Sequence, residues 1–394
     1  MTLGGRVRGS ERGALVVLYC VTAAVFADMY IAQPILPLLS REFRIAPATA
    51  GLSLSVVVLA IALASSVYGL LSDAFGRKPV MVATCLLLTV PTLLCAVAPT
   101  FGWLLAFRAM QGALIPGLSG VAVAYLGDQY RGAALGGAVG RYVSASIAGA
   151  LLGRVVSGLI ADAFGWRTAF IVWGVVTLAS AGAMAQVLPG DRRTGPVVWR
   201  QAYGGMAGHF RNRRVVGAFV IGATLFFAYT GVFTYLSYYL TAPPFRLPTA
   251  IVSGVYVVYL AGVIASPIAG RLSARFTRPA ILACGMAIAG LGIVGTLAPF
   301  LPVIVVSLVV LCGGMSVAQS TAPAFVNVSA RGATGSAGAL YLAFYYLGAT
   351  FGSVVPGYAW QSWGWHGVAA TCGAGLTVAL LADWLLCGSE GASS

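Results

Sequence analysis

Long apolar stretches separated by short polar turns run along the chain from end to end. Each is about 20 residues or longer, enough for an α-helix to cross a hydrocarbon core of roughly 30 Å. The strands of a membrane barrel would instead show short segments in which apolar and polar residues alternate, and the sequence has none. The pattern predicts twelve transmembrane helices, near residues 14–38, 48–71, 79–99, 101–126, 133–161, 167–188, 214–240, 248–270, 279–298, 301–327, 333–360 and 366–387.

The second half of the chain repeats features of the first at a distance close to 200 residues. The polar segment 69–79 is partly repeated at 270–279, and the glycine-rich segment 149–158 is partly repeated at 348–357. Matching positions are Gly69 and Gly270, Phe75 and Phe276, Arg77 and Arg278, Gly149 and Gly348, Gly153 and Gly352, and the dipeptides Gly165-Trp166 and Gly364-Trp365. A repeat of this length predicts an all-α polytopic membrane protein whose twelve helices form two parallel six-helix repeats. We place the halves at residues 1–189 and 214–394, joined by a polar cytoplasmic linker at 190–213.

Composition makes lipid the expected solvent. Hydrophobic residues make up 59% of the chain and charged residues 8%, whereas soluble proteins carry roughly 25% charged residues. Most of the 23 basic residues fall on the side of the membrane that holds the N-terminus. The positive-inside rule therefore predicts a multi-pass protein of a bacterial inner membrane with both termini in the cytoplasm. The net charge of +14 then reflects topology and contact with anionic lipids, and we expect no nucleic acid partner.

The sequence contains no pattern typical of an enzyme. It has two histidines, His209 and His366, and both lie in expected loops or at the end of a span. A nucleophile elbow, a phosphate-binding loop and metal-type cysteine spacing are all missing from the sequence. We therefore predict no catalytic residues, no metal and no cofactor. The expected partners are a small-molecule substrate, protons and membrane lipids, and the expected state is a monomer.

Several motifs give the chain a family resemblance. The segment Gly69-x-x-x-Asp73-x-x-Gly76-Arg77-Lys78 resembles the signature loop of the major facilitator superfamily. Arg108-Ala-Met-Gln111-Gly112 is similar to the Arg-x-x-Gln-Gly motif of its proton-coupled members. The glycines of the fifth stretch resemble the antiporter motif of the drug–proton antiporter branch, and segment 26–37 resembles the first helix of a bacterial efflux-permease subgroup. The antiporter motif has Gly-Pro where this chain has Gly153-Arg154. The resemblance implies a secondary transporter that works by alternating access, and proton-coupled efflux is the first expectation.

Four ionisable residues lie well inside the expected spans, namely Asp28, Arg108, Arg141 and Arg154. Charges at such depth are costly and are functional candidates. At 1.5 Å per residue, Asp28, Arg108 and Arg154 lie about 11–15 Å from the outer ends of their helices, whereas Arg141 lies about 20 Å deeper. We expect the first three to form a proton-coupling group in which Asp28 changes its protonation state. A static Asp–Arg pair and direct binding of a cation are the alternatives.

The signature loop predicts a conformational latch. Asp73 would face a neighbouring helix end, and Arg77 and Lys78 would bridge to Asp128 at the end of the fourth span. Such contacts would hold the outward-open state and break when the inner side opens. The latch residues are Gly69, Asp73, Gly76, Arg77, Lys78 and Asp128. Simple topogenic charge is the alternative interpretation.

The substrate cavity is expected to combine the charges of the first half with polar and aromatic residues of both halves. The candidates are Tyr30, Gln33, Gln111, Arg141, Tyr142, Tyr235, Gln319, Asn327 and Tyr345. Pro34 and Pro37 are expected to break the first helix beside Gln33. Three interior arginines against one aspartate leave an excess of positive charge, which predicts anionic, zwitterionic or neutral substrates anchored by Arg154 and Arg108. Proton-coupled uptake of an anionic or zwitterionic metabolite stays open as an alternative, as does a non-transporting sensor or lipid scramblase on the same scaffold.

Overall fold

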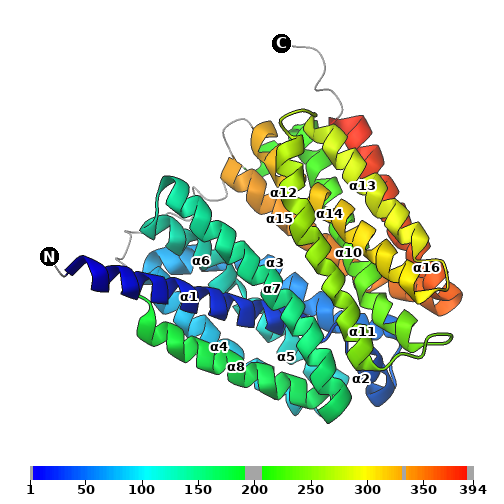
Figure 1. The fold of residues 1–394 in the computed structure, drawn as a ribbon, viewed down its shortest axis with the longest axis horizontal. Coiled ribbons are helices and arrows are strands. Elements are labelled where there is room, and N and C mark those ends of the chain that lie inside the picture. Colours follow the sequence, from blue (N-terminus) through cyan, green and yellow to red (C-terminus); the bar gives the residue numbers. More distant parts are fainter. Residues whose placement is uncertain (1–2, 191–205, 331–333, 388–394) are drawn as a thin grey trace. The chain divides into compact units, whose positions relative to one another are not determined.

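Helices are the only regular elements in the part of the chain that the structure, a computed structural model, describes: residues 3–190, 206–330 and 334–387 (Figure 1). The contacts divide the chain into two units, one made of residues 1–38 and 59–197 and the other of residues 39–58 and 198–394. Most of the expected linker, residues 191–205, lies outside the described residues.

The helices of the first unit are α1 (Leu3–Tyr30), α4 (Arg77–Ala96), α5 (Phe101–Leu114), α6 (Pro116–Gln129), α7 (Gly132–Phe164) and α8 (Trp166–Val187). Two helices, α2 (Leu36–Phe43) and α3 (Pro47–Phe75), contribute residues to both units. The second unit contains η1 (Met206–Arg211), α10 (Arg213–Thr241), α11 (Thr249–Val255), η2 (Tyr256–Val258), α12 (Tyr259–Leu272), α13 (Arg278–Gly295), α14 (Leu301–Ser329), α15 (Thr334–Gly352), α16 (Val355–Ala382) and η3 (Asp383–Cys387).

Eleven segments of the described chain are long and apolar enough to cross a membrane. They match eleven of the twelve stretches predicted from the sequence. The exception is the stretch at 333–360, most of which forms α15. The residues of α15 include several tyrosines, threonines and glycines, which lower its hydropathy.

The internal repeat is visible in how the helices pack. In the first unit α1 packs against α7 and α8, and in the second unit α10 packs against α15 and α16 (Figure 1). A Cβ atom at Gly153 of α7 would lie 2.5 Å from the carbonyl oxygen of Ala27 in α1. At the matching position of the second unit, a Cβ at Gly352 would lie 2.8 Å from the Cα of Phe227 in α10. In each unit, therefore, two helices (α1 with α7, and α10 with α15) touch through their backbones. Small residues allow such close contact in membranes.

The glycine of each Gly-Trp echo occupies a left-handed conformation. Gly165 has a φ of 85° and Gly364 a φ of 55°, values that residues other than glycine rarely adopt. Gly165 is the single residue between α7 and α8. Gly364 interrupts α16 with a kink, so residues 365–382 form a separate helical part that overlaps the predicted twelfth span.

Two predicted spans are divided by turns of two or more residues, while two others, 101–126 and 248–270, are interrupted only by Ile115 and by the short helix η2. The stretch 14–38 stops being helical at Tyr30, passes through turns at 31–35 and resumes as α2. Pro34 explains this break, because it has no N–H and disfavours helical geometry at Gln33. The stretch 333–360 breaks at residues 353–354, between α15 and α16, and Pro356 follows in the first turn of α16. The first break lies where Pro34 was expected to interrupt the helix, whereas the continuous helix predicted over 333–360 is wrong at residues 353–354.

Candidate functional site

A group of buried polar side chains surrounds the end of α1 in the first unit. Arg108 of α5 is fully buried. It donates from Nη1 to the backbone oxygen of Asp28 at 2.9 Å and from Nη2 to that of Met29 at 2.8 Å. These oxygens belong to the last turn of α1, where a helix leaves its carbonyl groups without partners. The guanidinium therefore caps the helix, and its positive charge faces the negative end of the helix dipole.

A chain of hydrogen bonds connects this cap to α4. Arg108 also donates to Oε1 of Gln111 at 2.8 Å, and Nε2 of Gln111 donates to the hydroxyl of Thr92 at 2.7 Å. The Thr92 hydroxyl donates in turn to the backbone oxygen of Leu88. All three side chains are fully buried. Each member of the chain has a partner, as a buried polar network requires to be stable.

The Asp28 carboxyl group has a different environment from its own backbone oxygen. Its Oδ2 accepts a hydrogen bond of 2.7 Å from the Thr177 hydroxyl of α8. Its Oδ1 is buried and has no hydrogen-bond partner, and the residue as a whole is fully buried. An ionised carboxylate is costly to bury with an unsatisfied oxygen. Arg108 therefore contacts Asp28 through the main chain, and the carboxyl group is left in a place where a proton would neutralise it.

Arg154 of α7 reaches the same segment from the other side. Its Nε donates to Oε1 of Gln33 at 2.6 Å, and its Nη1 donates to the backbone oxygen of Ala150. The guanidinium carbon lies 3.6 Å from the centre of the Tyr30 ring, an arrangement in which the ring face attracts the cation. Tyr30 is the last residue of α1, and Gln33 lies within the break that follows it. Three of the predicted interior charges thus meet at residues 28–33.

Two other candidates of the first unit lie elsewhere. Arg141 is exposed and donates from Nε to the backbone oxygen of Gly137, one turn earlier in α7. Tyr142 is buried, and its hydroxyl donates to the backbone oxygen of Ser119 in α6. The structure therefore does not bring Arg141 or Tyr142 to the end of α1.

The tyrosine candidates of the second unit differ in their surroundings. Tyr235 is fully buried, and its hydroxyl donates to the backbone oxygens of Ser353 at 2.9 Å and Val354 at 3.3 Å. It therefore satisfies oxygens at the break between α15 and α16, much as Arg108 does at the end of α1. Tyr345 is half-buried and stacks on Phe226 with ring centres 3.9 Å apart.

The amide candidates lie on α14. The Nε2 atom of Gln319 is buried and has no hydrogen-bond partner. A buried donor without a partner is uncommon, and it makes Gln319 the candidate of the second unit with unused hydrogen-bonding capacity. Asn327, two turns further along the helix, is exposed.

The signature loop forms a small ion-pair cluster. Arg77 bonds to Asp73 and, from Nε, to Oδ2 of Asp128 at 3.2 Å. The contact with Asp128 is the one that the sequence predicted, whereas Lys78 donates to the backbone oxygen of Leu188. Asp73 was expected to face a neighbouring helix end, and its partner here is Arg77.

Backbone geometry completes this cluster. Gly76, which directly precedes α4, has a φ of 95° and therefore needs to be glycine. The backbone oxygen of Gly69 accepts a hydrogen bond from Ser72, whose hydroxyl also accepts one from Arg77. The two carboxylate side chains are more than 40% exposed, so each ion pair contributes at most about 1 kcal/mol.

Sequence reasoning missed the threonines of this site. Thr177 and Thr92 bind Asp28 and Gln111, yet threonine is common in membrane helices and usually bonds to its own backbone. Nothing in the sequence distinguishes Thr177 from the other threonines, because its role depends on which face of α8 meets α1.

Comparison with known proteins identifies the family. The model of the Major Facilitator Superfamily matches residues 18–263 and 248–391. The "MFS-type transporter YybF" of Bacillus subtilis is 34% identical over 362 residues, covering 91% of this chain and 89% of the relative. The "Inner membrane transport protein YnfM" of Escherichia coli is 33% identical over 366 residues, covering 92% of this chain and 88% of the relative.

Solved structures share the fold at low identity. A bacterial homolog of the human lysosomal transporter Spinster matches with a TM-score of 0.81 and 14% identity, over 98% of this chain and 99% of that one. A point mutant of the nucleoside transporter NupG matches with a TM-score of 0.78 and 13% identity, over 95% and 98% of the two chains.

Proposed function

The chain belongs to the major facilitator superfamily and is a multi-pass transporter of the bacterial inner membrane, and we propose that it exports a small molecule in exchange for protons. The proposed cycle is alternating access between halves at 1–189 and 214–394, with both termini in the cytoplasm. The cluster of Arg77, Asp73 and Asp128 serves as the latch of this cycle.

The environment of Asp28 carries the proposal of proton coupling. Its carboxyl group is fully buried, accepts one hydrogen bond from Thr177 and has one oxygen without a partner. Protonation removes the cost of the buried charge, and hydration of the site restores the ionised form. A transporter that opens this place alternately to the two sides of the membrane would carry one proton per cycle on Asp28.

Export as the direction rests on the glycines of α7. Gly149 and Gly153 pack against the backbone of α1, and this spacing resembles the antiporter motif. Arg154 stands where that motif has proline, and it bonds to Gln33 beyond the end of α1. In this chain the arginine would take over the role of fixing α7 against the broken first helix. Uptake driven by protons is the alternative that the experiment below distinguishes.

The charge of the substrate depends on how the two buried arginines are used. Arg108 is held by two backbone oxygens and Gln111, so we assign it to the scaffold. Arg154 stacks on Tyr30 at the helix break, and we propose it as the residue that attracts anionic or zwitterionic substrates. Gln319, with its unpartnered Nε2, is the proposed polar contact from the second half.

Proton flux in proteoliposomes tests this function. The purified protein is reconstituted with a pH-sensitive dye in the lumen, and a panel of anionic, zwitterionic, neutral and cationic amphipathic compounds is added with the pH gradient imposed in either direction. If the protein is an antiporter, at least one compound should cross the membrane in the direction opposite to the imposed flow of protons. Its movement should change the lumenal pH in the direction expected for exchange. The Asp28→Asn variant should remove this pH change.

Two results would overturn the proposal. A pH change with the sign of co-transport would replace export by uptake. If transport by the unmodified protein does not depend on the pH gradient, the protein is not coupled to protons. If transport by Asp28→Asn is still driven by the gradient, the coupling does not use Asp28.

A further inference from the structure

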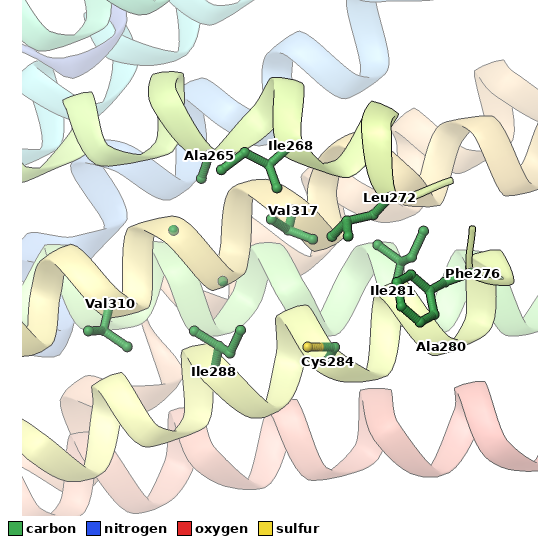
Figure 2. Close-up of a pocket in the computed structure, with 12 residues that line it drawn as sticks. Ala265, Ile268, Leu272, Phe276, Ala280, Ile281, Cys284, Ile288, Val310 and Val317 are labelled. Atoms are coloured by element: carbon green, nitrogen blue, oxygen red, sulfur yellow. The ribbon is translucent and has the colours of Figure 1, made fainter. Parts of the chain in front are cut away.

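An apolar groove runs along the surface of the second unit, between α12 and α13 (Figure 2). Both helices pack on α14, which forms the floor of the groove. The groove has a volume of about 470 Å³, and all of the residues that line it are apolar. Leu272 and Phe276 lie at one end, and Ile288 and Val310 lie at the other.

Small residues create the groove. The floor at Gly313 and Gly314 has no side chains, and Ala265 and Ala280 leave space in the walls. Gly314 is needed for packing, since a Cβ there would lie 2.5 Å from the backbone oxygen of Gly285 in α13. Gly313 has no such need, because the nearest atom to its Cβ would be the Ala265 Cβ at 4.0 Å. The groove therefore stays open beside a tight helix contact.

The dimensions of the groove match half a bilayer. From Arg278 at the start of α13 to Ile288 the helix rises about 15 Å, and half of a typical hydrocarbon core is also about 15 Å. The segment 273–277 connects two membrane-spanning segments, so this end of the groove lies at the membrane surface. The other end lies near the bilayer centre. The groove therefore spans the depth of one leaflet, which is also the depth that an acyl chain of that leaflet occupies.

Three arginines stand at the surface end of the groove. Arg271 is in the last turn of α12, Arg275 is exposed in the turn and Arg278 is the first residue of α13. Within the described residues none of them has a hydrogen-bond or ion-pair partner for its side chain. This end of the groove therefore carries three positive charges within eight residues.

The internal repeat shows that this charge has lost its protein partners. Arg278 matches Arg77, which is held by Asp73 and Asp128 in the first unit. The positions that correspond to these two carboxylates in the second half are Ala274 and Val328. The second half therefore keeps the arginine and lacks both acidic residues, so its positive charge is available to an external anion.

We propose that this groove binds one acyl chain of an anionic membrane phospholipid, whose phosphate group is held by Arg271, Arg275 and Arg278. Each basic residue near a membrane surface strengthens the binding of anionic lipid. The apolar groove then selects a lipid over a soluble phosphate, because a free anion gains nothing from Phe276, Cys284 or Ile288. This site is independent of the proposed transport cycle and needs no substrate.

Photo-crosslinking in lipid nanodiscs tests the site. The full chain is placed in phosphatidylcholine nanodiscs that contain a small fraction of either phosphatidylglycerol or phosphatidylcholine with a diazirine on one acyl chain, and adducts are mapped by peptide mass spectrometry. Phosphatidylglycerol should label segments 265–288 and 310–317 more strongly than phosphatidylcholine does. The Arg271→Gln/Arg275→Gln variant should reduce this labelling roughly tenfold, to the level of phosphatidylcholine.

Matched variants make the outcome specific. Arg211→Gln/Arg213→Gln removes two exposed arginines of the second unit outside the groove and should leave the labelling unchanged. Gly313→Leu fills the groove and should reduce labelling by both lipids, with an unchanged melting temperature as the check on folding.

Three results would overturn the proposal. They are equal labelling by the two lipids, labelling by phosphatidylglycerol that survives the loss of Arg271 and Arg275, and displacement by soluble glycerol phosphate. The last would assign the arginines to a free phosphate compound.

Discussion

Arg108 donates its hydrogen bond to the backbone oxygen of Asp28 at 2.9 Å, while the Asp28 carboxyl group turns to Thr177. The two oppositely charged residues are neighbours, yet the arginine serves the end of a helix and the carboxyl group stays separate. Arg108 therefore acts in stability, and Asp28 is left for chemistry.

Replacing Arg108 by methionine should destabilise the protein. The variant leaves the backbone oxygens of Asp28 and Met29 without their donor, and each buried group without a partner costs about 1–3 kcal/mol. Gln111 Oε1 also loses its bond to Arg108 and keeps only the weaker bond from the Cys95 thiol. We expect a clearly lower melting temperature in detergent, measured by intrinsic tryptophan fluorescence. Arg131→Met is the control, because Arg131 is exposed and donates only to Gly127 in the contacts described here. Equal melting temperatures of the two variants would contradict the capping role.

Asp28→Asn should leave stability unchanged or raise it. The amide oxygen can accept the hydrogen bond from Thr177, and the variant removes the cost of burying a charge beside an unsatisfied position. Thr177→Val should lower stability by about 1–2 kcal/mol, because Asp28 then loses this partner. Thermal unfolding of both variants at neutral pH measures the difference. A strongly destabilised Asp28→Asn protein would mean that the carboxylate has a structural partner.

Asp383→Asn provides a matched comparison for proton coupling. Asp383 in η3 is also buried and has an oxygen without a hydrogen-bond partner, but it belongs to the second unit. In the proteoliposome assay, Asp383→Asn should keep the dependence on the pH gradient that Asp28→Asn loses. If only Asp383→Asn loses it, the proton site has been assigned to the wrong carboxyl group.

Gly153→Ala should destabilise the protein, and Gly352→Ala should do the same in the second unit. A Cβ at either glycine would collide with the backbone of the neighbouring helix, and such overpacking costs typically about 1–3 kcal/mol. Gly140→Ala in the same helix α7 is the control, since a Cβ there meets nothing within 4 Å. That variant should be neutral or stabilising by up to about 1 kcal/mol, because alanine favours helix. Melting temperatures and yields of the three variants decide this.

Arg77→Ala should change the conformational cycle more than the stability. Each of the two partly exposed ion pairs that are lost contributes at most about 1 kcal/mol, whereas a latch that depends on Arg77 would no longer hold one conformation. Labelling of cysteines introduced at the two ends of the spans reports which side is open, and the variant should shift this balance. Arg131→Ala should not. If Arg77→Ala leaves unchanged which side of the protein is open, the charges of the Arg77 cluster determine only the membrane topology.

The repeat and its glycines were the most predictable part of the fold. Gly153 and Gly352 stand at matching positions in the sequence, and both prove to be places where helices touch through their backbones. Pro34 likewise indicated the break after α1. The break at residues 353–354 was not predicted, because it depends on Tyr235 satisfying the freed oxygens from a helix more than 100 residues away.

The candidate site was predictable in its membership and less so in its pairings. Apolar surroundings identified Asp28, Arg108 and Arg154, and depth along the helices placed them at a similar level. Depth says nothing about rotation, so the sequence could not tell that Arg108 would reach backbone oxygens or that Thr177 would face Asp28. Depth had already set Arg141 about 20 Å away from the other three charges. In the structure Arg141 bonds to Gly137, and Tyr142 bonds to Ser119.

The single residue between α7 and α8 has a mechanical consequence. Gly165 alone joins the helix that carries Arg154 to the helix that carries Thr177. If α7 tilts, either the two dihedral angles of Gly165 turn or α8 moves with it as part of one lever. A displacement of Arg154 would then be transmitted through Gly165 to Thr177, whose hydroxyl group donates to the Asp28 carboxyl group.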